Sequence, residues 1–123
     1  MIDERVNIGL NESHRGQGSS MFTGRPQGKQ VRDKLEIANM DNQQKKYLVE
    51  IPLKTTSFNP SFFLGLFFPS VKKLGGYDNF ADKYKIVILT DNKFIKESLE
   101  LDLKDCERQA RNEFSKKTGL SIF

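Results

Sequence analysis

The amino-acid sequence predicts a small α/β domain, in which helices pack on a mixed, mostly parallel sheet. The segments Tyr47–Leu53 and Tyr84–Leu89 are continuous apolar runs of the kind that form inner strands covered on both faces. Segments with helical spacing of apolar residues alternate with these strands, and this alternation favours parallel pairing. The chain has 123 residues, of which 37% are hydrophobic, so we expect one domain over residues 1–123 with a single core.

The first third of the chain is predicted to contain an edge strand, a loop and a helix. Residues Val6 to Leu10 alternate apolar with small or polar side chains, as an edge strand does. Residues 11–24 are rich in Gly, Ser and Asn and predict a loop, with a short strand near Met21–Phe22. Pro26 opens a helix, and residues 39–45 form a polar turn. The apolar face of this helix carries Gly28, Val31, Leu35 and Ala38, and Gly28 would let it approach a strand closely.

The central strand is predicted to lead directly into the most apolar helix of the chain. Its pairing should end at Pro52, because proline has no N–H to donate. The turn Thr55–Ser61 follows, and Asn59 in this turn can cap the next helix. We expect that helix over residues 61–74, ended by Gly75 in a left-handed conformation. Its core face should carry Phe63, Phe67, Val71 and Leu74.

The last part of the chain predicts a strand followed by a long helical stretch. A loop over residues 75–82 precedes the second inner strand. Asp91 is expected to cap the helical stretch, and a break is expected near Leu101–Asp102. Residues 120–123 form a C-terminal tail. One face of the helical stretch carries Ile95, Leu99, Leu103, Cys106, Ala110 and Phe114.

Composition points away from disulfide, metal and membrane chemistry. Cys106 is the only cysteine, which excludes an internal disulfide and fits a reducing, cytoplasmic compartment. It lies on an apolar helix face, so we expect a core residue and not a nucleophile. His14 is the only histidine and is expected to be a solvated loop residue. No catalytic set, signal peptide or membrane-length run stands out, so we expect a protein without enzymatic activity, cofactor, metal or membrane contact.

The charge pattern argues against nucleic acid as the first choice of partner. Lys and Arg number 20 against 16 Asp and Glu, and the two signs are interleaved instead of forming a basic stripe. The segment Gly24–Gln30 has glycines too closely spaced for a phosphate loop and lacks its Ser or Thr. The alternative function that stays open is a nucleic-acid or nucleotide binder. It would use Arg15, Arg25, Lys29 and Arg32.

The turn before the apolar helix is the most informative segment for function. It brings three hydroxyl residues to the start of a helix, where a phosphoryl group would meet free N–H groups and the positive end of the helix dipole. Ordinary cap and turn chemistry is the competing interpretation. The helix itself has more apolar residues than one buried face requires: Phe62, Leu64, Leu66 and Phe68.

This excess of apolar surface has two interpretations. It is either a surface for a protein partner or a second copy of the chain, or it is covered by the loop over residues 75–82 and the tail. On the first interpretation, the chain is a regulatory protein-binding module. The residues predicted to contact its partner are Thr55, Thr56, Ser57, Phe58, Asn59, Ser61 and Phe62.

The stretch Tyr47–Gly76, YLVEIPLKTTSFNPSFFLGLFFPSVKKLGG, resembles the middle of STAS domains, the fold of bacterial anti-sigma-factor antagonists. The similarity is greater to a STAS-like domain family of unknown function, through the pair Ser57-Phe58 and the spacing of Gly28, Arg32 and Leu35. The resemblance covers about residues 22–105 and implies a STAS-like fold.

The resemblance also implies a class of partner. In the antagonists, a serine of an Asp-Ser-Ser-Gly turn is phosphorylated by a kinase of the GHKL ATPase type. The matching positions here hold Pro60 and Phe62, so the phosphorylated serine itself is not carried over. Ser57 and Ser61 are the nearby candidates for phosphorylation, and a GHKL-type ATPase or similar switch protein is the expected partner.

Overall fold

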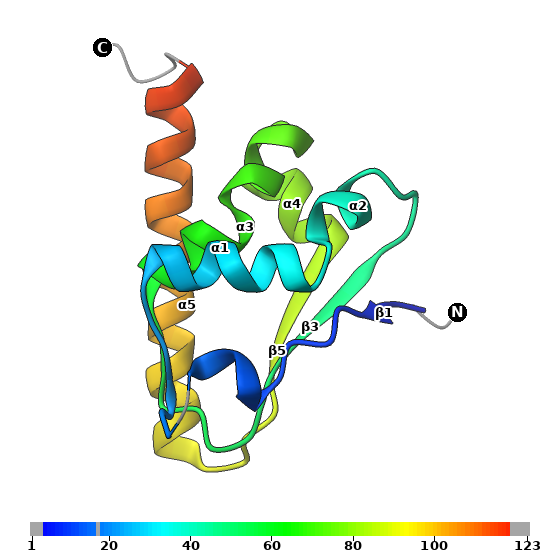
Figure 1. The fold of residues 1–123 in the computed structure, drawn as a ribbon. Coiled ribbons are helices and arrows are strands. Elements are labelled where there is room, and N and C mark those ends of the chain that lie inside the picture. Colours follow the sequence, from blue (N-terminus) through cyan, green and yellow to red (C-terminus); the bar gives the residue numbers. More distant parts are fainter. Residues whose placement is uncertain (1–3, 17, 119–123) are drawn as a thin grey trace.

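The computed structural model describes residues 4–16 and 18–118, and it confirms an α/β fold (Figure 1). The predicted tail over residues 120–123 lies outside the described residues. In chain order the elements are β1 (Val6–Asn7), the 3-10 helix η1 (Glu12–Arg15), β2 (Met21–Phe22), α1 (Arg25–Lys34), α2 (Ile37–Asp41), β3 (Tyr47–Ile51), β4 (Ser57–Phe58), α3 (Pro60–Leu74), α4 (Tyr77–Lys83), β5 (Tyr84–Ile88) and α5 (Lys93–Thr118).

The main sheet has the order β1-β3-β5, and each of its pairs is parallel. The prediction that Tyr47–Ile51 forms the inner strand is confirmed, and β3 ends just before Pro52 as expected. The prediction that β5 is also an inner strand is wrong, because within the described residues it pairs with β3 alone. Burial alternates along β3, with Leu48 and Glu50 partly exposed, so helices cover only one face of the sheet and not both.

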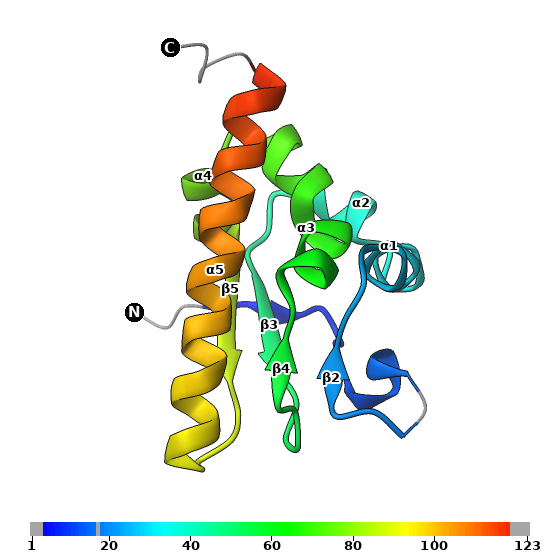
Figure 2. The same cartoon turned by 90° about the vertical axis from the view of Figure 1, so that its left-hand side faces the viewer.

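A second, two-stranded sheet joins β2 to β4 in parallel, with Met21 opposite Ser57 and Phe22 opposite Phe58. The predicted strand at Met21–Phe22 is therefore confirmed. The prediction that the central strand leads directly into the apolar helix is wrong, since β4 lies between them. Because β2 leads into α1 and β4 leads into α3, this small sheet delivers the two helices side by side (Figure 2).

Helices α1 and α3 cross at two glycines. A Cβ atom built on Gly28 would lie 2.2 Å from the carbonyl oxygen of Phe62, and one on Gly65 would lie 2.2 Å from the carbonyl oxygen of Arg25. The close approach predicted for Gly28 therefore occurs, but to a helix and not to a strand. Only residues without a side chain allow the two backbones to touch in this way.

The apolar face predicted for the first helix ends earlier than expected. Glu36 adopts a left-handed conformation with φ of 56°, which ends α1 and starts α2 in a new direction. As a result Ile37 is buried in place of Ala38, which is exposed. Part of the predicted polar turn over residues 39–45 belongs to α2.

Local chemistry sets both ends of α3 as predicted. The backbone N–H of Ser61 donates to the side-chain oxygen of Asn59 at 2.7 Å, and Gly75 ends the helix in the left-handed conformation. The side chains predicted to lie outside its core face are nevertheless buried, because α1, α2, α4 and α5 all contact α3. Those side chains are Phe62, Leu64, Leu66 and Phe68, so the prediction of exposed apolar surface here is wrong.

The alternative interpretation, that the segment over residues 75–82 covers α3, is confirmed in part, because this segment packs on α3. Residues 77–83 form α4 and are not a loop, and α4 contributes Phe80 to the core. Aromatic rings in contact connect the two sheets through α3, with centroid separations of 4.9–6.4 Å. These rings are Phe22, Phe58, Phe62, Phe63, Phe67, Phe80, Tyr84 and Tyr47.

Helix α5 is one continuous helix without the predicted break (Figure 2). Its cap is Asn92 and not Asp91, since the side chain of Asn92 accepts the N–H of Ile95 at 3.1 Å. Asp102 does not start a new helix. Its carboxylate accepts the backbone N–H of Phe58 at 2.9 Å, so this N–H of β4 has a hydrogen-bond partner. The apolar face is confirmed, with Leu99, Cys106 and Ala110 buried.

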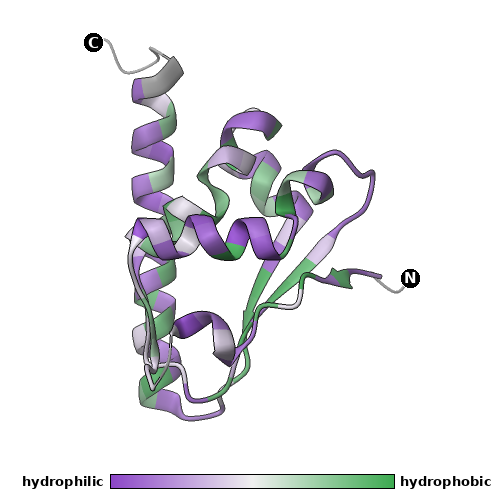
Figure 3. Ribbon diagram, viewed as in Figure 1, coloured by the Kyte–Doolittle hydropathy of each residue, from purple (hydrophilic) through white to green (hydrophobic). Residues whose placement is uncertain are grey.

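Hydrophilic residues dominate α1, whereas hydrophobic stretches mark β3 and β5 (Figure 3).

The helix crossing gives a direct stability prediction. Gly28→Ala places a methyl group within the van der Waals radius of the α3 backbone, so the helices must separate. We expect the free energy of unfolding, measured with urea, to fall by about 1–3 kcal/mol. Gln30→Ala, at an exposed position of the same helix, should change it by less than about 0.5 kcal/mol. Equal unfolding curves for the two variants would contradict the close contact.

Candidate functional site

The segment predicted to bind a partner is only partly accessible. Thr55, Phe58 and Phe62 have exposed fractions of 1%, 0% and 0%, so the prediction of an accessible surface is wrong for these three. Thr56 and Ser61 are exposed, and Ser57 and Asn59 are partly exposed. The accessible part therefore consists of polar side chains, while the phenylalanines face the core.

Each buried member of this segment has an internal partner. The hydroxyl of Thr55 accepts a hydrogen bond from the Arg15 guanidinium at 2.8 Å. The rings of Phe58 and Phe62 pack against Phe22, with centroid separations of 5.4 Å and 5.0 Å. These contacts bind the segment to the rest of the domain, so they cannot at the same time be offered to a partner.

Accessible hydroxyl side chains occur close to the small sheet and in the first turn of α3. We call this group the hydroxyl ledge and define it as Ser20, Thr56, Ser57 and Ser61. The hydroxyl oxygens of Ser20 and Thr56 lie 2.7 Å apart across β2 and β4. Two apolar side chains are exposed in this part of the chain. Met21 of β2 has an exposed fraction of 42%, and Leu53, between β3 and β4, has 57%.

The four cations predicted for nucleic-acid or nucleotide binding do not form one site. Arg15 donates to the carbonyl of Leu53 and to Thr55, and Arg32 is engaged in a buried polar network. Only Arg25 and Lys29 line a common pocket. Arg15 and Arg32 therefore stabilise the fold through internal hydrogen bonds.

The network around Arg32 centres on Asp41, whose exposed fraction is 7%. Its carboxylate accepts hydrogen bonds from the Arg32 guanidinium and the Ser70 hydroxyl at 2.8 Å each, and from the Tyr84 hydroxyl at 2.7 Å. Burial, followed by this bond to Asp41, raises the pKa of Tyr84. Arg32 also donates to the carbonyl of Leu66 at 2.8 Å. The network thus joins α1, α2, α3 and β5.

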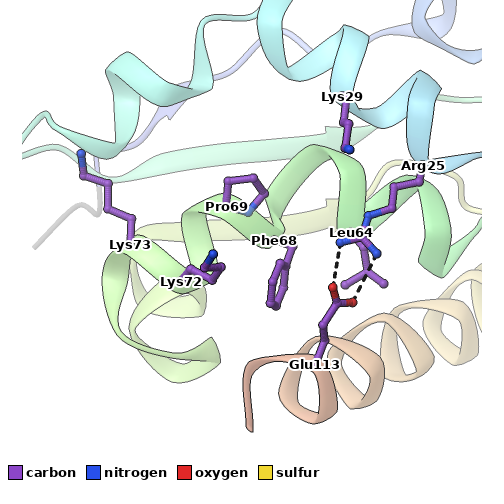
Figure 4. Close-up of a pocket in the computed structure, with 8 residues that line it drawn as sticks. All are labelled: Arg25, Lys29, Leu64, Phe68, Pro69, Lys72, Lys73 and Glu113. Atoms are coloured by element: carbon purple, nitrogen blue, oxygen red, sulfur yellow. Dashed lines mark hydrogen bonds and ion pairs between the residues drawn. The ribbon is translucent and has the colours of Figure 1, made fainter. Parts of the chain in front are cut away.

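A pocket of about 560 Å³ lies between α1, α3 and α5 (Figure 4). We call it the basic groove. Arg25 and Lys29 come from α1, and Lys72 and Lys73 come from the carboxyl end of α3. Its remaining lining residues are Leu64, Phe68 and Pro69 of α3 and Glu113 of α5.

The cations of the basic groove are only partly neutralised. Arg25 forms an ion pair with Glu113 at 2.9 Å and lies 5.9 Å from the ring centroid of Phe68. Lys73 donates to the side-chain oxygen of Asn42. Within the described part of the chain, no ion pair involves Lys29 or Lys72. Sequence interpretation missed this groove, because the pair Lys72-Lys73 alone is typical of a solvated helix end.

Two further residues have defined environments. The prediction that His14 is solvated is wrong, because its side chain is buried. Its Nδ1 accepts the N–H of Asn11 at 3.1 Å. Burial lowers the pKa of His14, with a smaller contribution from Lys34. Cys106 is buried as predicted, and burial, then the charges of Asp102 and Asp105, raises the pKa of its thiol. Among residues 4–16 and 18–118, no cluster of three His, Cys, Asp or Glu could hold a metal, and no helix is long and apolar enough to cross a membrane.

Comparison with known proteins returned no relative. No family model matches the chain, and neither the curated proteins nor the solved structures contain a match.

The Asp41 network predicts a large difference between two cations of α1. Arg32→Gln leaves Asp41 as a buried carboxylate without its counter-charge, so the free energy of unfolding should fall by about 3–5 kcal/mol. Lys29→Gln should change it by less than about 0.5 kcal/mol, because Lys29 is exposed. Similar urea midpoints for both variants would show that Arg32 is not a structural residue.

The environment of Cys106 predicts an unreactive thiol. Because its pKa is raised and its side chain is buried, little thiolate is accessible at neutral pH. We expect a thiol-specific reagent such as dithionitrobenzoate to label the native protein only as fast as it unfolds, and to label it at once in urea. Rapid stoichiometric labelling of the native protein would contradict the buried position.

Proposed function

We propose that this chain is a non-enzymatic regulatory module of STAS-like fold, which acts in the cytoplasm by binding a switch protein. A GHKL-type ATPase is the partner class that we favour. The hydroxyl ledge is the proposed contact surface. The observation that carries this proposal is the position of Ser57 and Ser61, whose side chains remain accessible beside buried phenylalanines.

The ledge has the chemistry of a phosphorylation switch. Ser61 lies in the first turn of the fifteen-residue helix α3, where a phosphoryl group would be stabilised by the positive end of the helix dipole. Ser57 lies on β4, opposite Met21. A phosphoryl group adds a charge of about −2, which changes the surface that a partner meets. Met21, which lies opposite Ser57 on the small sheet and is exposed, supplies apolar contact area.

The resemblance to STAS domains supports the hydroxyl ledge as the contact surface, but with a different residue as the site of phosphorylation. The position that would match the phosphorylated serine holds Phe62, which is buried against Phe22. The proposed modification therefore lies on Ser61 or Ser57, which both precede that position. The alternative function is a nucleic-acid or nucleotide binder. Of the four residues proposed for it, Arg25 and Lys29 line a common pocket.

Site-specific photo-crosslinking tests the contact surface. A benzophenone side chain is introduced at Thr56 on the ledge and, as a matched control, at Ser98, an exposed position of α5. In cells that express the full chain, we expect a discrete cross-linked species from position 56 that contains an ATPase of the kinase type. Ser57→Asp and Ser61→Asp should each reduce its yield, whereas Ser57→Ala and Ser61→Ala should not.

Three results would contradict the proposal. The first is a yield from position 56 no greater than from position 98. The second is a cross-link only to a second copy of the chain, which would assign the ledge to self-association. The third is insensitivity of the ATPase cross-link to both aspartate substitutions.

A further inference from the structure

We propose that the basic groove binds a small molecule that carries at least two linked phosphate groups. This site lies between α1, α3 and α5 and does not include the hydroxyl ledge, so the proposal does not depend on the one above. The observation behind it is that one pocket is lined by cations of two helices, Arg25 and Lys29 of α1 and Lys72 and Lys73 of α3 (Figure 4).

Charge is the first argument. Four cationic side chains line the groove, and Glu113 is the only acidic one. The ion pair with Arg25 engages Glu113, while Lys29 and Lys72 have no ion pair within the described residues. Like charges held around one pocket repel each other, and an anion placed between them removes this repulsion and gains charge-assisted hydrogen bonds. The uncompensated charge therefore selects an anionic ligand.

Spacing is the second argument. The α3 residues that line the groove extend from Leu64 to Lys73, and a helical rise of about 1.5 Å per residue places these ends roughly 13 Å apart. Arg25 lies near the Leu64 end, and Lys72 and Lys73 lie beyond Pro69 (Figure 4). A chain of two or three phosphates presents oxygens at more than one point along the groove, and phosphate oxygens are suited to both Arg and Lys.

The shape of the groove favours a small molecule over a nucleic-acid strand. A volume of about 560 Å³ is in the range of small-molecule sites. The carboxylate of Glu113 stands on the α5 side of the groove, where it would repel a phosphodiester backbone that continued past Arg25. The ring of Pro69 is exposed and offers an apolar surface to the part of the ligand that carries no phosphate.

Isothermal titration of the full chain tests the site with two probes, ATP and tripolyphosphate, without divalent cations. The test variant combines Lys29→Gln with Lys72→Gln. The matched control combines Lys85→Gln with Lys104→Gln, which removes the same charge from exposed lysines of a different pocket, beside β5. Thermal melting confirms that both variants are folded.

We expect the wild-type chain to bind at least one probe, and binding to weaken between about 50 mM and about 200 mM salt. The test variant should lose at least about tenfold in affinity, and the control should stay within about twofold of wild type. Equal affinities for the two probes would assign the contacts to the phosphate chain, and tighter ATP binding would add a contact of the nucleoside with Pro69.

Several outcomes would overturn the proposal. Absence of binding for both probes at millimolar concentration is one. Equal weakening in the test and control variants is another, because it would show attraction to the net charge alone. Tighter binding of a short single-stranded oligonucleotide than of ATP would replace the small molecule by nucleic acid. The groove variant should leave the cross-link from position 56 unchanged, so the two proposals can fail separately.

Discussion

The contact between the backbones of α1 and α3 is the constraint on which the rest of the structure depends. Helices that pack through side chains keep their axes about 8–10 Å apart. Gly28 and Gly65 have no side chain, and each faces a backbone carbonyl of the other helix. The mostly hydrophilic helix α1 can therefore lie directly on the most apolar helix of the chain. Together with α2, α4 and α5 it encloses α3, which is how a short chain buries so many phenylalanines.

The same contact determines what the surface can offer. Since α3 is enclosed, its phenylalanines stabilise the domain and cannot serve as a docking surface. What remains accessible at its amino end is polar, the hydroxyl ledge on the small sheet. At the other side, the close approach of α1 places Arg25 and Lys29 in one pocket with the lysines at the carboxyl end of α3. Arg32, one turn further along α1, is directed into the buried network of Asp41.

The parts of the fold that depend on local chemistry could be predicted from the sequence. Asn59, Pro60 and Gly75 set the limits of α3 through backbone groups within a few residues, and the central strand ends before Pro52 for the same kind of reason. The strand Ser57–Phe58 could not be predicted, because it is only two residues long and the Thr, Asn and Pro residues around it are typical of a turn. It exists because β2, far away in the sequence, pairs with it.

The candidate sites depend on contacts between distant residues, so the sequence indicated only parts of them. Ser57 and Ser61 could be recognised as hydroxyls near a helix start, but which neighbours are buried follows from the packing of Phe22. Asp41 looked like one more polar residue of a turn, and only the fold brings Ser70 and Tyr84 to its carboxylate. The basic groove requires the crossing of α1 and α3, which no spacing in the sequence reveals.

Hydrogen exchange along α3 tests the central claim of this account most directly. If α3 is enclosed over its buried stretch, Phe62 to Phe68, the amides of residues 65–68 can exchange only when the whole domain unfolds. Their exchange free energies should then equal the free energy of global unfolding measured with urea. Exchange of these amides at a free energy well below the global value, while the amides of β3 keep the global value, would show that α3 opens by itself and would contradict the account.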